Sequence, residues 1–219
     1  MLQVKIAVLL DPSNNWIDKY IRQIAMTDAL QERFSFFLSY NPDEIKNFDI
    51  VFILGYTKVL KKSFLDSNKL NLVVHESDLP RGRGFSPVQR QILDGKNSIP
   101  VSLIEAKEEV DSGDIFEKYI LELNGYELLD EIREKQGCAT FQIIKNFLNK
   151  YPNNVGVKQE GKAIFYKKRT EKDDKLDIDK TIREQFNHFR IANNIKHPLY
   201  FIIDGHKFYL KICSDKSLE

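Results

Sequence analysis

Short apolar runs alternate with segments of helical periodicity along the first half of the chain. Four runs before residue 77 are typical of strands buried on both faces, and they span residues 4–10, 34–40, 49–56 and 70–76. Apolar side chains recur at helical spacing over residues 16–25, and residues 86–96 predict a second helix from Ser86-Pro87 to Gly95. Residues 98–106 predict a further strand. This rhythm predicts an α/β, Rossmann-like fold with a mostly parallel sheet flanked by helices.

The second half of the chain combines longer helical patterns with a predicted hairpin. Residues 126–150 predict one long helix, which we expect Gly137 to bend or break. Residues 162–170 predict a strand, residues 178–193 an amphipathic helix, and residues 199–212 a β-hairpin around Gly205. We therefore expect a main domain over residues 1–160. A small C-terminal extension of strand, helix and β-hairpin is expected over residues 161–219.

Composition and charge describe an ordinary globular chain. The net charge of the 219 residues is +1, with 42% apolar and 30% charged residues, so the charge indicates neither nucleic acid nor a membrane as a partner. No apolar stretch reaches the roughly 20 residues of a membrane span, and "MLQVKIAVLLD" is interpreted as a first buried strand rather than a signal peptide. Cys138 and Cys213 lie far apart without metal-binding spacing. We expect free thiols, a cytoplasmic protein and no metal site.

Two polar motifs carry the candidate chemistry. His75 ends the run 70–76, and Asp111 lies in the Asp-Ser-Gly-Asp turn after the strand at 98–106. Because ligands bind beyond the carboxyl ends of parallel strands, the two side chains could meet above the sheet. A carboxylate beside an imidazole fixes the ring and stabilises its charged form, which makes a candidate acid/base pair. Taken singly, such a histidine is more often a structural hydrogen-bonding group, and Asp-Ser-Gly an ordinary turn.

In combination, the two motifs resemble a known family. "HESDLPRGRGFSPVQRQILDGK" (75–96) followed by "IPVSLIEAKEEVDSGDIF" (99–116) is similar to the folate-dependent formyltransferases, which include methionyl-tRNA formyltransferase, and is closest to the sugar N-formyltransferases. The family pattern is roughly Asn-x-His-x-Ser-x-Leu-Pro-x-x-Arg-Gly-x-x-Pro, followed by Asp-(Ser/Thr)-Gly-Asp-Ile. The matching positions are His75, Ser77, Leu79, Pro80, Arg83, Gly84 and Pro87 in the first motif, and Asp111, Gly113, Asp114 and Ile115 in the second.

The resemblance implies that residues 1–160 form a formyltransferase catalytic domain. It implies transfer of a formyl group from 10-formyltetrahydrofolate to an amine without a metal, with His75 handling the proton and the oxyanion while Asp111 orients His75. The implied folate-binding residues are Gly55, Tyr56, Val110 and Asp114. The implied substrate-binding residues are Ser77, Arg81, Arg83, Gly84, Lys168 and Arg169. Strand-end turns and solvated charged loops are the alternative interpretation of Gly55-Tyr56, of the arginines and of Lys168.

One position departs from the family pattern. The family asparagine falls on Val73, whose side chain has no hydrogen-bond donor. Such a donor to an oxyanion can lower a barrier by about 3 kcal/mol. Asn71, two residues earlier on the same face, is not expected to replace it. Two hypotheses remain: His75 carries the oxyanion as an imidazolium, helped by a backbone N–H or a water, or the chain is a non-catalytic folate- or sugar-binding relative.

The resemblance also indicates an acceptor. A small extension with an aromatic hairpin favours the amine of an amino-dideoxy sugar as the acceptor. By the resemblance, we expect this sugar to be linked to a nucleotide and to serve the synthesis of a surface glycan. A tRNA-acting relative would be expected to carry a larger, basic C-terminal barrel. Methionyl-tRNA formyltransferase-like activity and hydrolysis of formylfolate to formate are the alternatives. The partners expected are therefore folate and an amino-sugar nucleotide, with no nucleic acid and no membrane. The hairpin over 199–212 predicts a homodimer, or else a sheet packed on its own domain.

Overall fold

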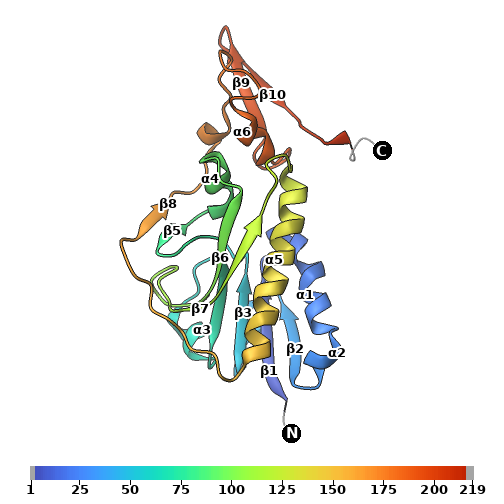
Figure 1. Ribbon diagram of the computed structural model, residues 1–219, viewed down its shortest axis with the longest axis vertical. Coiled ribbons are helices and arrows are strands. Elements are labelled where there is room, and N and C mark those ends of the chain that lie inside the picture. The colour runs from blue at the N-terminus through green and yellow to red at the C-terminus, as the bar shows by residue number, and fades with distance from the viewer. Residues whose placement is uncertain (1–2, 216–219) are drawn as a thin grey trace.

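A six-stranded sheet forms the centre of the molecule, and a two-stranded hairpin projects from one end of the body (Figure 1). The computed structural model describes residues 3–215. The strand order of the sheet is β2-β1-β3-β4-β6-β7. Its strands are β1 (Val4–Leu10), β2 (Phe34–Ser39), β3 (Ile50–Leu54), β4 (Asn71–His75), β6 (Ser98–Glu105) and β7 (Ile115–Glu122). Strands β9 (Leu199–Ile203) and β10 (His206–Leu210) form the hairpin.

Parallel pairing dominates the sheet. The pairs β1–β2, β1–β3 and β3–β4 are parallel, whereas β4–β6 and β6–β7 are antiparallel. The helices are α1 (Asp18–Ala25), α2 (Asp28–Gln31), α3 (Lys62–Asp66), α4 (Pro87–Leu93), α5 (Leu129–Lys150) and α6 (Phe186–Arg190), with 3-10 helices η1 (Pro12–Ile17), η2 (Pro42–Glu44) and η3 (Glu171–Asp174). The predicted α/β, Rossmann-like class with a C-terminal hairpin is confirmed.

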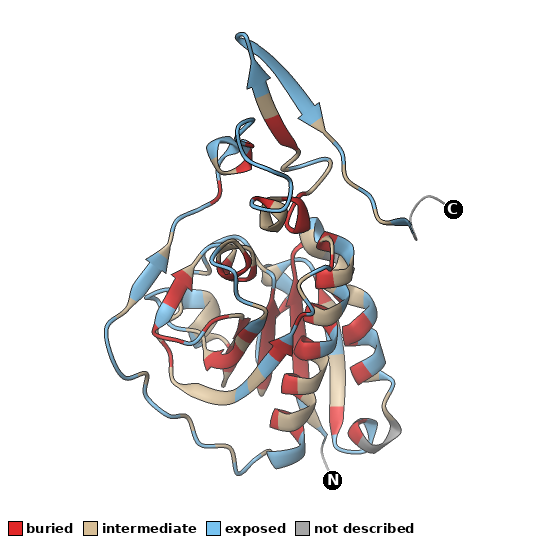
Figure 2. Ribbon diagram, turned by 45° about the horizontal axis from the view of Figure 1, so that its top comes forward, coloured by how far each residue is buried: buried red, intermediate tan, exposed pale blue. Residues whose placement is uncertain are grey.

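The sheet buries apolar side chains on both of its faces. The larger apolar cluster joins the sheet to α1, α4 and α5, and includes Leu72 and Val74 of β4. A smaller cluster on the opposite face joins Ala7, Leu9, Val51 and Ile53 to Phe64 of α3. Figure 2 shows the buried residues concentrated in the central strands and on the inner sides of the helices, while most of the hairpin is exposed.

Gly137 does not break α5, which runs without interruption from Leu129 to Lys150. A Cβ at Gly137 would lie 2.1 Å from the ring of Tyr20 in α1. The glycine therefore allows α1 and α5 to approach each other closely. The prediction of a bend or break is wrong because tertiary packing, rather than local flexibility, explains this glycine.

The predicted helix over 178–193 is also mostly wrong, because only α6 is helical. Residues before α6 form turns held by side chains: Thr181 and Glu184 bond each other, and the Gln185 amide bonds both the N–H and the C=O of Asp177. These side chains compete with the helical hydrogen bonds of the backbone. Apolar residues at helical spacing are therefore left exposed, as Ile178 and Ile182 are.

The predicted strand over 162–170 is reduced to β8 (Ile164–Tyr166), which pairs in parallel with β5 (Arg81–Gly84). The sequence patterns predicted neither β5 nor β7. The boundary between residues 160 and 161 stays a prediction. Strand β8 lies beyond that boundary and pairs with a strand of the main domain, so the two parts share a small sheet.

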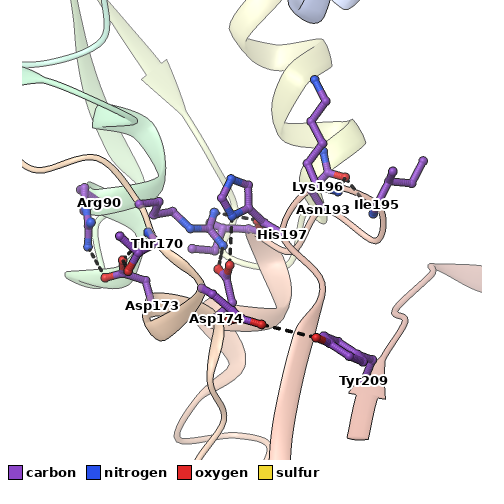
Figure 3. A network of polar contacts seen from close by, with 12 residues as sticks. Arg90, Thr170, Asp173, Asp174, Asn193, Ile195, Lys196, His197 and Tyr209 are labelled. Atoms are coloured by element: carbon purple, nitrogen blue, oxygen red, sulfur yellow. Dashed lines mark hydrogen bonds and ion pairs between the residues drawn. The ribbon is translucent and has the colours of Figure 1, made fainter. Parts of the chain in front are cut away.

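A network of polar side chains connects the extension internally and to the body (Figure 3). Asp174 is buried between the guanidinium of Arg169 and Nδ1 of His197, with 2.9 Å between the imidazole and the carboxylate. Asp173 accepts a hydrogen bond of 2.9 Å from Arg90 of α4. These contacts fix η3 against both the start of the hairpin and the body.

Cys138 and Cys213 are exposed free thiols. Among the helices of residues 3–215, none has the length and apolar composition that crossing a membrane requires. Over the same residues, no three His, Cys, Asp or Glu side chains gather in a way that could hold a metal ion.

Candidate functional site

His75 is the last residue of β4, at the carboxyl end of the parallel part of the sheet. It pairs with Ser102 of β6 and is 6% exposed. Side chains alternate along a strand, so His75 shares a face with Val73, while Val74 points into the larger apolar cluster. The strand end therefore places one imidazole above the sheet.

Both ring nitrogens of His75 face hydrogen-bond acceptors. Nε2 lies 2.8 Å from the carbonyl oxygen of Gly82, and Nδ1 lies 3.5 Å from Oδ2 of Asp111. A carbonyl only accepts, so Nε2 carries the proton in this contact. A neutral ring would then direct the lone pair of Nδ1 at a carboxylate, which is unfavourable. A ring protonated on both nitrogens could donate to Gly82 and point its second N–H toward Asp111.

Asp111 is held in place by contacts from outside its own loop. Its Oδ2 accepts a hydrogen bond of 2.8 Å from the backbone N–H of Gly84, and its φ is +55°. The amide of Gln159 donates to the carbonyl oxygens of Asp111 and Gly113, at 2.8 Å each. The loop that contains Asp111 is thus fixed from β5 and from the segment that precedes β8.

Strand β5 covers the imidazole. Gly82 and Gly84 have φ values of +82° and +101°, and a Cβ at Gly84 would lie 2.6 Å from the carbonyl oxygen of Tyr166. Only glycine fits these positions without strain, because the backbone is left-handed and β8 lies in contact. The two glycines let β5 lie between β8 and His75.

The substrate candidates in and before β5 differ in their exposure and in their contacts. Arg83 is 8% exposed. Its guanidinium donates hydrogen bonds of 2.8 Å to Glu109 and to Gln159, so its donors are used within the protein. Ser77 is 1% exposed, and its hydroxyl has no hydrogen-bond partner among the described residues. Arg81 is exposed.

Arg81 lines an open groove of about 770 Å³. The groove lies between residues 78–81, the start of β7 and residues 157–162, and its charged residues are Asp78, Arg81, Glu117, Lys118, Lys158, Glu160 and Lys162. Lys118 pairs with Asp78, and Glu117 pairs with Lys150 outside the groove. This volume is in the range of small-molecule sites, which is about 300–1,000 Å³.

The two remaining substrate candidates lie in the extension. Arg169 is 7% exposed and bonds Asp174 and the carbonyl oxygen of Ile191. Lys168, next to it, is exposed. These partners of Arg169 belong to the extension, so the structure does not bring it to His75 and Asp111.

The folate candidates stand around the end of β3 and the Asp111 loop. Tyr56 is half-buried and packs, with Leu60, Val73 and Ala106, on the open side of the smaller apolar cluster. Gly55 has a φ of +57°, and its carbonyl accepts a 2.6 Å hydrogen bond from Asn14. We call Tyr56, Leu60, Val73 and Ala106 the apolar wall, and these partly buried side chains are candidates to hold the flat ring system of a folate.

On the Asp111 loop, Val110 is 48% exposed and Asp114 lies 3.4 Å from the ammonium of Lys107. Val110 thus offers an apolar surface on the loop. The carboxylate of Asp114 is engaged by a cation, whereas its backbone carbonyl accepts from the N–H of Glu105 at 3.0 Å.

Val73 lies in the apolar wall. It occupies the position of the asparagine in the family pattern, so this position has no side-chain hydrogen-bond donor. Asn71 does not replace it: its side-chain amide donates to the carbonyl of Leu65 at 2.9 Å. Asn71 lies four positions before His75 along the strand, a distance of about 13 Å. The expectation about Asn71 agrees with this geometry.

Two acidic residues at this end of the sheet escaped the sequence reasoning. Asp11 bonds the backbone and hydroxyl of both Ser13 and Thr57. Burial disfavours its carboxylate, but these hydrogen bonds outweigh burial and hold the pKa of Asp11 below its usual value. Asp11 thereby ties the loop after β1 to the loop after β3. Its signal was its position at the end of a buried strand.

The other is Glu76. Burial raises the pKa of its carboxyl, an effect that the nearby His75 charge and a hydrogen bond from Gln136 partly oppose. Its signal was the occurrence of an acid directly after the candidate histidine. The family pattern allows any residue at position 76, so the match to the pattern did not single out Glu76.

Comparisons with known proteins give a consistent match. Residues 20–136 match the family model described as formyl transferase. Methionyl-tRNA formyltransferase of Thermosipho melanesiensis is 34% identical over 134 residues, which is 61% of this chain and 44% of that protein. The chain therefore spans less than half the length of this curated relative.

Solved structures match over nearly all of the chain. Methionyl-tRNA formyltransferase from Clostridium thermocellum has a TM-score of 0.81 at 22% identity, covering 100% of this chain and 96% of that one. A sugar N-formyltransferase from a Shewanella species has a TM-score of 0.73 at 15% identity, covering 97% and 98%. HypX from Aquifex aeolicus, solved with tetrahydrofolic acid, has a TM-score of 0.68 at 16% identity, covering 93% and 36%. At these identities the likeness concerns the fold.

Proposed function

Because the chain belongs to the formyl transferase family, we propose that it is an N-formyltransferase that acts on the amine of an amino-dideoxy sugar, carried by a nucleotide. 10-Formyltetrahydrofolate supplies the formyl group when it is bound. The observation that carries the proposal is the contact of His75 with Asp111 at the end of β4, with a groove of small-molecule size beginning at residue 78.

The roles of the residues follow from their contacts. Asp111 orients the imidazole and compensates its charge, as a carboxylate beside a catalytic histidine does. The proton on Nε2 of His75 is directed at Gly82, so a substrate oxygen that displaces this carbonyl would meet a positively charged donor. A charged donor at the developing oxyanion stabilises the transition state. The imidazolium can pass its Nε2 proton to the folate nitrogen that leaves, and the ring, then neutral, can accept the proton that the attacking amine loses.

The folate is proposed to lie against the wall of Tyr56, Leu60, Val73 and Ala106, with Gly55, Val110 and Asp114 around it. The backbone groups of these last residues are the proposed polar contacts. The acceptor is proposed to occupy the groove, where Arg81 is the cation closest in sequence to His75. A guanidinium suits the phosphates of a nucleotide. Ser77, Arg83 and Gly84 support this side of the site, and Lys168 is the exposed candidate in the extension.

A tRNA acceptor is the second candidate, and a specific observation favours it: the curated relative above is a methionyl-tRNA formyltransferase. Binding of RNA draws largely on phosphate contacts from clustered cations. The net charge of +1 gives the chain no general excess of such cations. The size of the groove supports the small acceptor instead.

The absence of a donor at Val73 supports a third possibility, a relative that binds folate and sugar without turnover. The imidazolium geometry of His75 supports the enzyme, because it supplies a donor at the same strand end.

A homodimer through the hairpin is part of the proposal. Ile202, Ile203, Phe208 and Tyr209 are between 36% and 58% exposed. Ile203 and Phe208 share one face of the hairpin, and Ile202 and Tyr209 share the other. Exposed apolar side chains on a two-stranded sheet favour burial against a second copy. Light scattering should give twice the monomer mass, and Phe208→Lys should return it to that of a monomer. A native protein that scatters as a monomer at all concentrations would exclude the dimer.

The activity can be tested with a panel of acceptors. The protein is incubated with 10-formyltetrahydrofolate and either amino-dideoxy-sugar nucleotides or methionyl-tRNA, and formylated products are identified by mass spectrometry. We expect one sugar nucleotide to gain a formyl group, and His75→Ala to abolish the gain. Formylation of methionyl-tRNA alone would assign the second candidate. Binding of both ligands without any formylated product would assign the binding protein, and formate release without an acceptor would assign a hydrolase.

A further inference from the structure

Asp11 directly follows β1, and its two carboxylate oxygens bond two different loops. The residue is 6% exposed. Oδ1 accepts hydrogen bonds from the backbone N–H of Ser13 at 2.9 Å and from its hydroxyl at 2.7 Å. Oδ2 accepts from the backbone N–H of Thr57 at 3.0 Å and from its hydroxyl at 2.5 Å. Ser13 therefore orients the carboxylate within its own loop, and the other oxygen holds the loop after β3.

Asn14 makes a second connection between the same two loops. Its side-chain amide donates to the carbonyl oxygen of Gly55 at 2.6 Å. A Cβ at Gly55 would lie 3.3 Å from the Cβ of Asn14, so the loops are in direct contact there. The contacts of Asp11 and Asn14 thus hold residues 57 and 55, on either side of Tyr56 in the sequence.

Residues 55–60 depend on these contacts, because the segment forms neither helix nor strand. Within residues 3–215, its hydrogen bonds come from the side chains of Asp11 and Asn14. Its apolar side chains Tyr56 and Leu60 pack on the smaller apolar cluster. Packing alone leaves the backbone of an irregular segment free to shift, whereas hydrogen bonds to a buried carboxylate fix it in one position.

The apolar wall is divided between this segment and the sheet. Val73 belongs to β4, and the backbone N–H of Ala106 donates to Asn71 of β4 at 2.8 Å, so the sheet positions this half of the wall. Tyr56 and Leu60 form the other half and lie in the irregular segment. The position of half of the wall therefore depends on the loop after β1.

We propose that Asp11 is a positioning residue for the formyl donor, because it holds Tyr56 and Leu60 in place before the folate binds. A wall that is already ordered loses less conformational entropy on binding. The effect on folate rests on the proposed formyl transfer, whereas the ordering of residues 55–60 is a property of the protein without ligands. Asp11 acts through this segment, so it should affect the affinity for folate and not the chemical step.

The first test is amide hydrogen exchange in the ligand-free protein, followed by NMR. Asp11→Asn keeps the shape of the side chain but has one acceptor oxygen in place of two. We expect the backbone N–H of Thr57 to exchange roughly tenfold faster in this variant, because a charge-assisted hydrogen bond is lost. Unchanged exchange at Thr57 in the folded variant overturns the proposal.

Asp43→Asn is the matched control. Asp43 is exposed, and its charge acts on Tyr56 as the charge of Asp11 does, but the hydrogen bonds of the segment are with Asp11 and Asn14. This variant should exchange at Thr57 as the native protein does. Equally fast exchange in both variants would assign the effect to charge near Tyr56, and would overturn the role of the hydrogen bonds.

The second test is the affinity for 5-formyltetrahydrofolate, a stable isomer of the donor, measured by calorimetry. Asp11→Asn should raise the dissociation constant roughly tenfold, the order of the cost of ordering one residue. Thr57→Val removes the hydroxyl contact alone and should raise it roughly threefold, whereas Thr57→Ser keeps the hydroxyl and should bind as the native protein does. If Asp11→Asn does not fold, equal constants for the two Thr57 variants overturn the proposal.

Kinetics with the acceptor found in the panel separate positioning from chemistry. Asp11→Asn should raise the KM for 10-formyltetrahydrofolate and leave kcat and the KM of the acceptor within about twofold of the native values. A lower kcat at an unchanged KM, or faster exchange at Thr57 without weaker folate binding, refutes the positioning role. If the native protein binds no formylfolate while Asp11→Asn still speeds exchange at Thr57, the proposed function fails and the ordering of residues 55–60 by Asp11 stands.

Discussion

Val73 and His75 share one face of β4, and together they determine which hydrogen bonds the end of this strand can donate to a ligand. Val73 packs in an apolar wall, and His75 presents Nε2–H to a carbonyl. An amide at position 73 would add a neutral donor beside the one on the ring. The hydrogen-bond donor on the ring then matters more here than in a site that has both donors.

Val73→Asn should raise kcat of formyl transfer by about ten- to a hundredfold, because it adds a donor near the oxyanion. The amide should also lower the melting temperature, since it enters an apolar wall. Val73→Leu is the control, because it changes shape without adding a donor. Equal rates for the two variants would show that position 73 does not reach the reacting oxygen.

Glu76→Gln should make the protein more stable at pH 8 and leave stability unchanged at pH 4. The folded protein binds the Glu76 proton more tightly than the unfolded chain, so native stability is fully present below pH 4.5 and falls as pH rises through the raised pKa. Each unit of that rise corresponds to about 1.4 kcal/mol. Urea unfolding at the two pH values measures it, and equal curves at pH 8 would contradict the expectation.

At this scale the sequence predicted His75 and Asp111 as a pair, because two motifs at strand ends converge whatever the details of the fold. It could not predict that Arg83 would be paired with Glu109 and Gln159. That outcome depends on residue 159 lying against residue 83, and no local pattern encodes it. Glu76 was missed because its environment comes from two helices distant in sequence.

Among the elements, β5 and β8 matter most for the site, since they form the small sheet that covers His75. β5 has only four residues, two of them glycine, and a glycine-rich segment is expected to be a loop. Its partner β8 comes from beyond residue 160. Pairing between remote short segments leaves no periodic signal, so neither the pairing nor the cover could be predicted.

Gly84→Ala should destabilise the protein by about 2 to 4 kcal/mol, through backbone strain and contact with Tyr166. Gly161→Ala is a matched control: its φ is +106°, near the +101° of Gly84, but no atom lies within 4 Å of the added Cβ. Gly161→Ala should therefore destabilise the protein only by the backbone strain, about 1 kcal/mol. Equal melting temperatures for the two variants would mean that β5 moves away from β8 without cost.

Burial rather than length decided which strands of the sheet were predicted, since β7, which has eight residues and only one of them buried, was missed. The buried strands and α5 were predicted within a few residues, because each repeats one pattern over many positions. The helix over 178–193 failed, because its apolar spacing was outweighed by side-chain hydrogen bonds within residues 177–185.

Across the whole molecule, buried charges attach the extension to the body. Arg190 of α6 is 1% exposed and bonds Glu127, which precedes α5, at 3.3 Å, and Asn97, which precedes β6, at 2.9 Å. Burial lowers the pKa of Arg190, and Glu127 opposes this effect. For Glu127 itself, burial favours the acid, but hydrogen bonds from Lys135 and from the backbone of Asn124 lower its pKa to about 2.

Acid should therefore loosen this connection. Because the folded pKa of Glu127 is depressed, its contribution is present above pH 4.5 and is lost as pH falls toward 2. Glu127→Gln should cost about 3 kcal/mol at pH 7, since it leaves the Arg190 charge buried and unpaired. The free energy of unfolding of this variant should also decrease less between pH 4.5 and 3 than that of the native protein. Asp66→Asn, which breaks an exposed pair, serves as the control in the same denaturation experiment.

The pairing of β8 with β5 also has a consequence for biosynthesis. His75 and Asp111 leave the ribosome well before Gln159, which fixes the Asp111 loop, and before Tyr166, which lies on Gly84. A nascent chain that ends before these residues carries both reactive side chains without their cover. The carboxyl end of β4 is thus completed late in translation, and a pause before residue 166 would expose an unfinished candidate site to the cell.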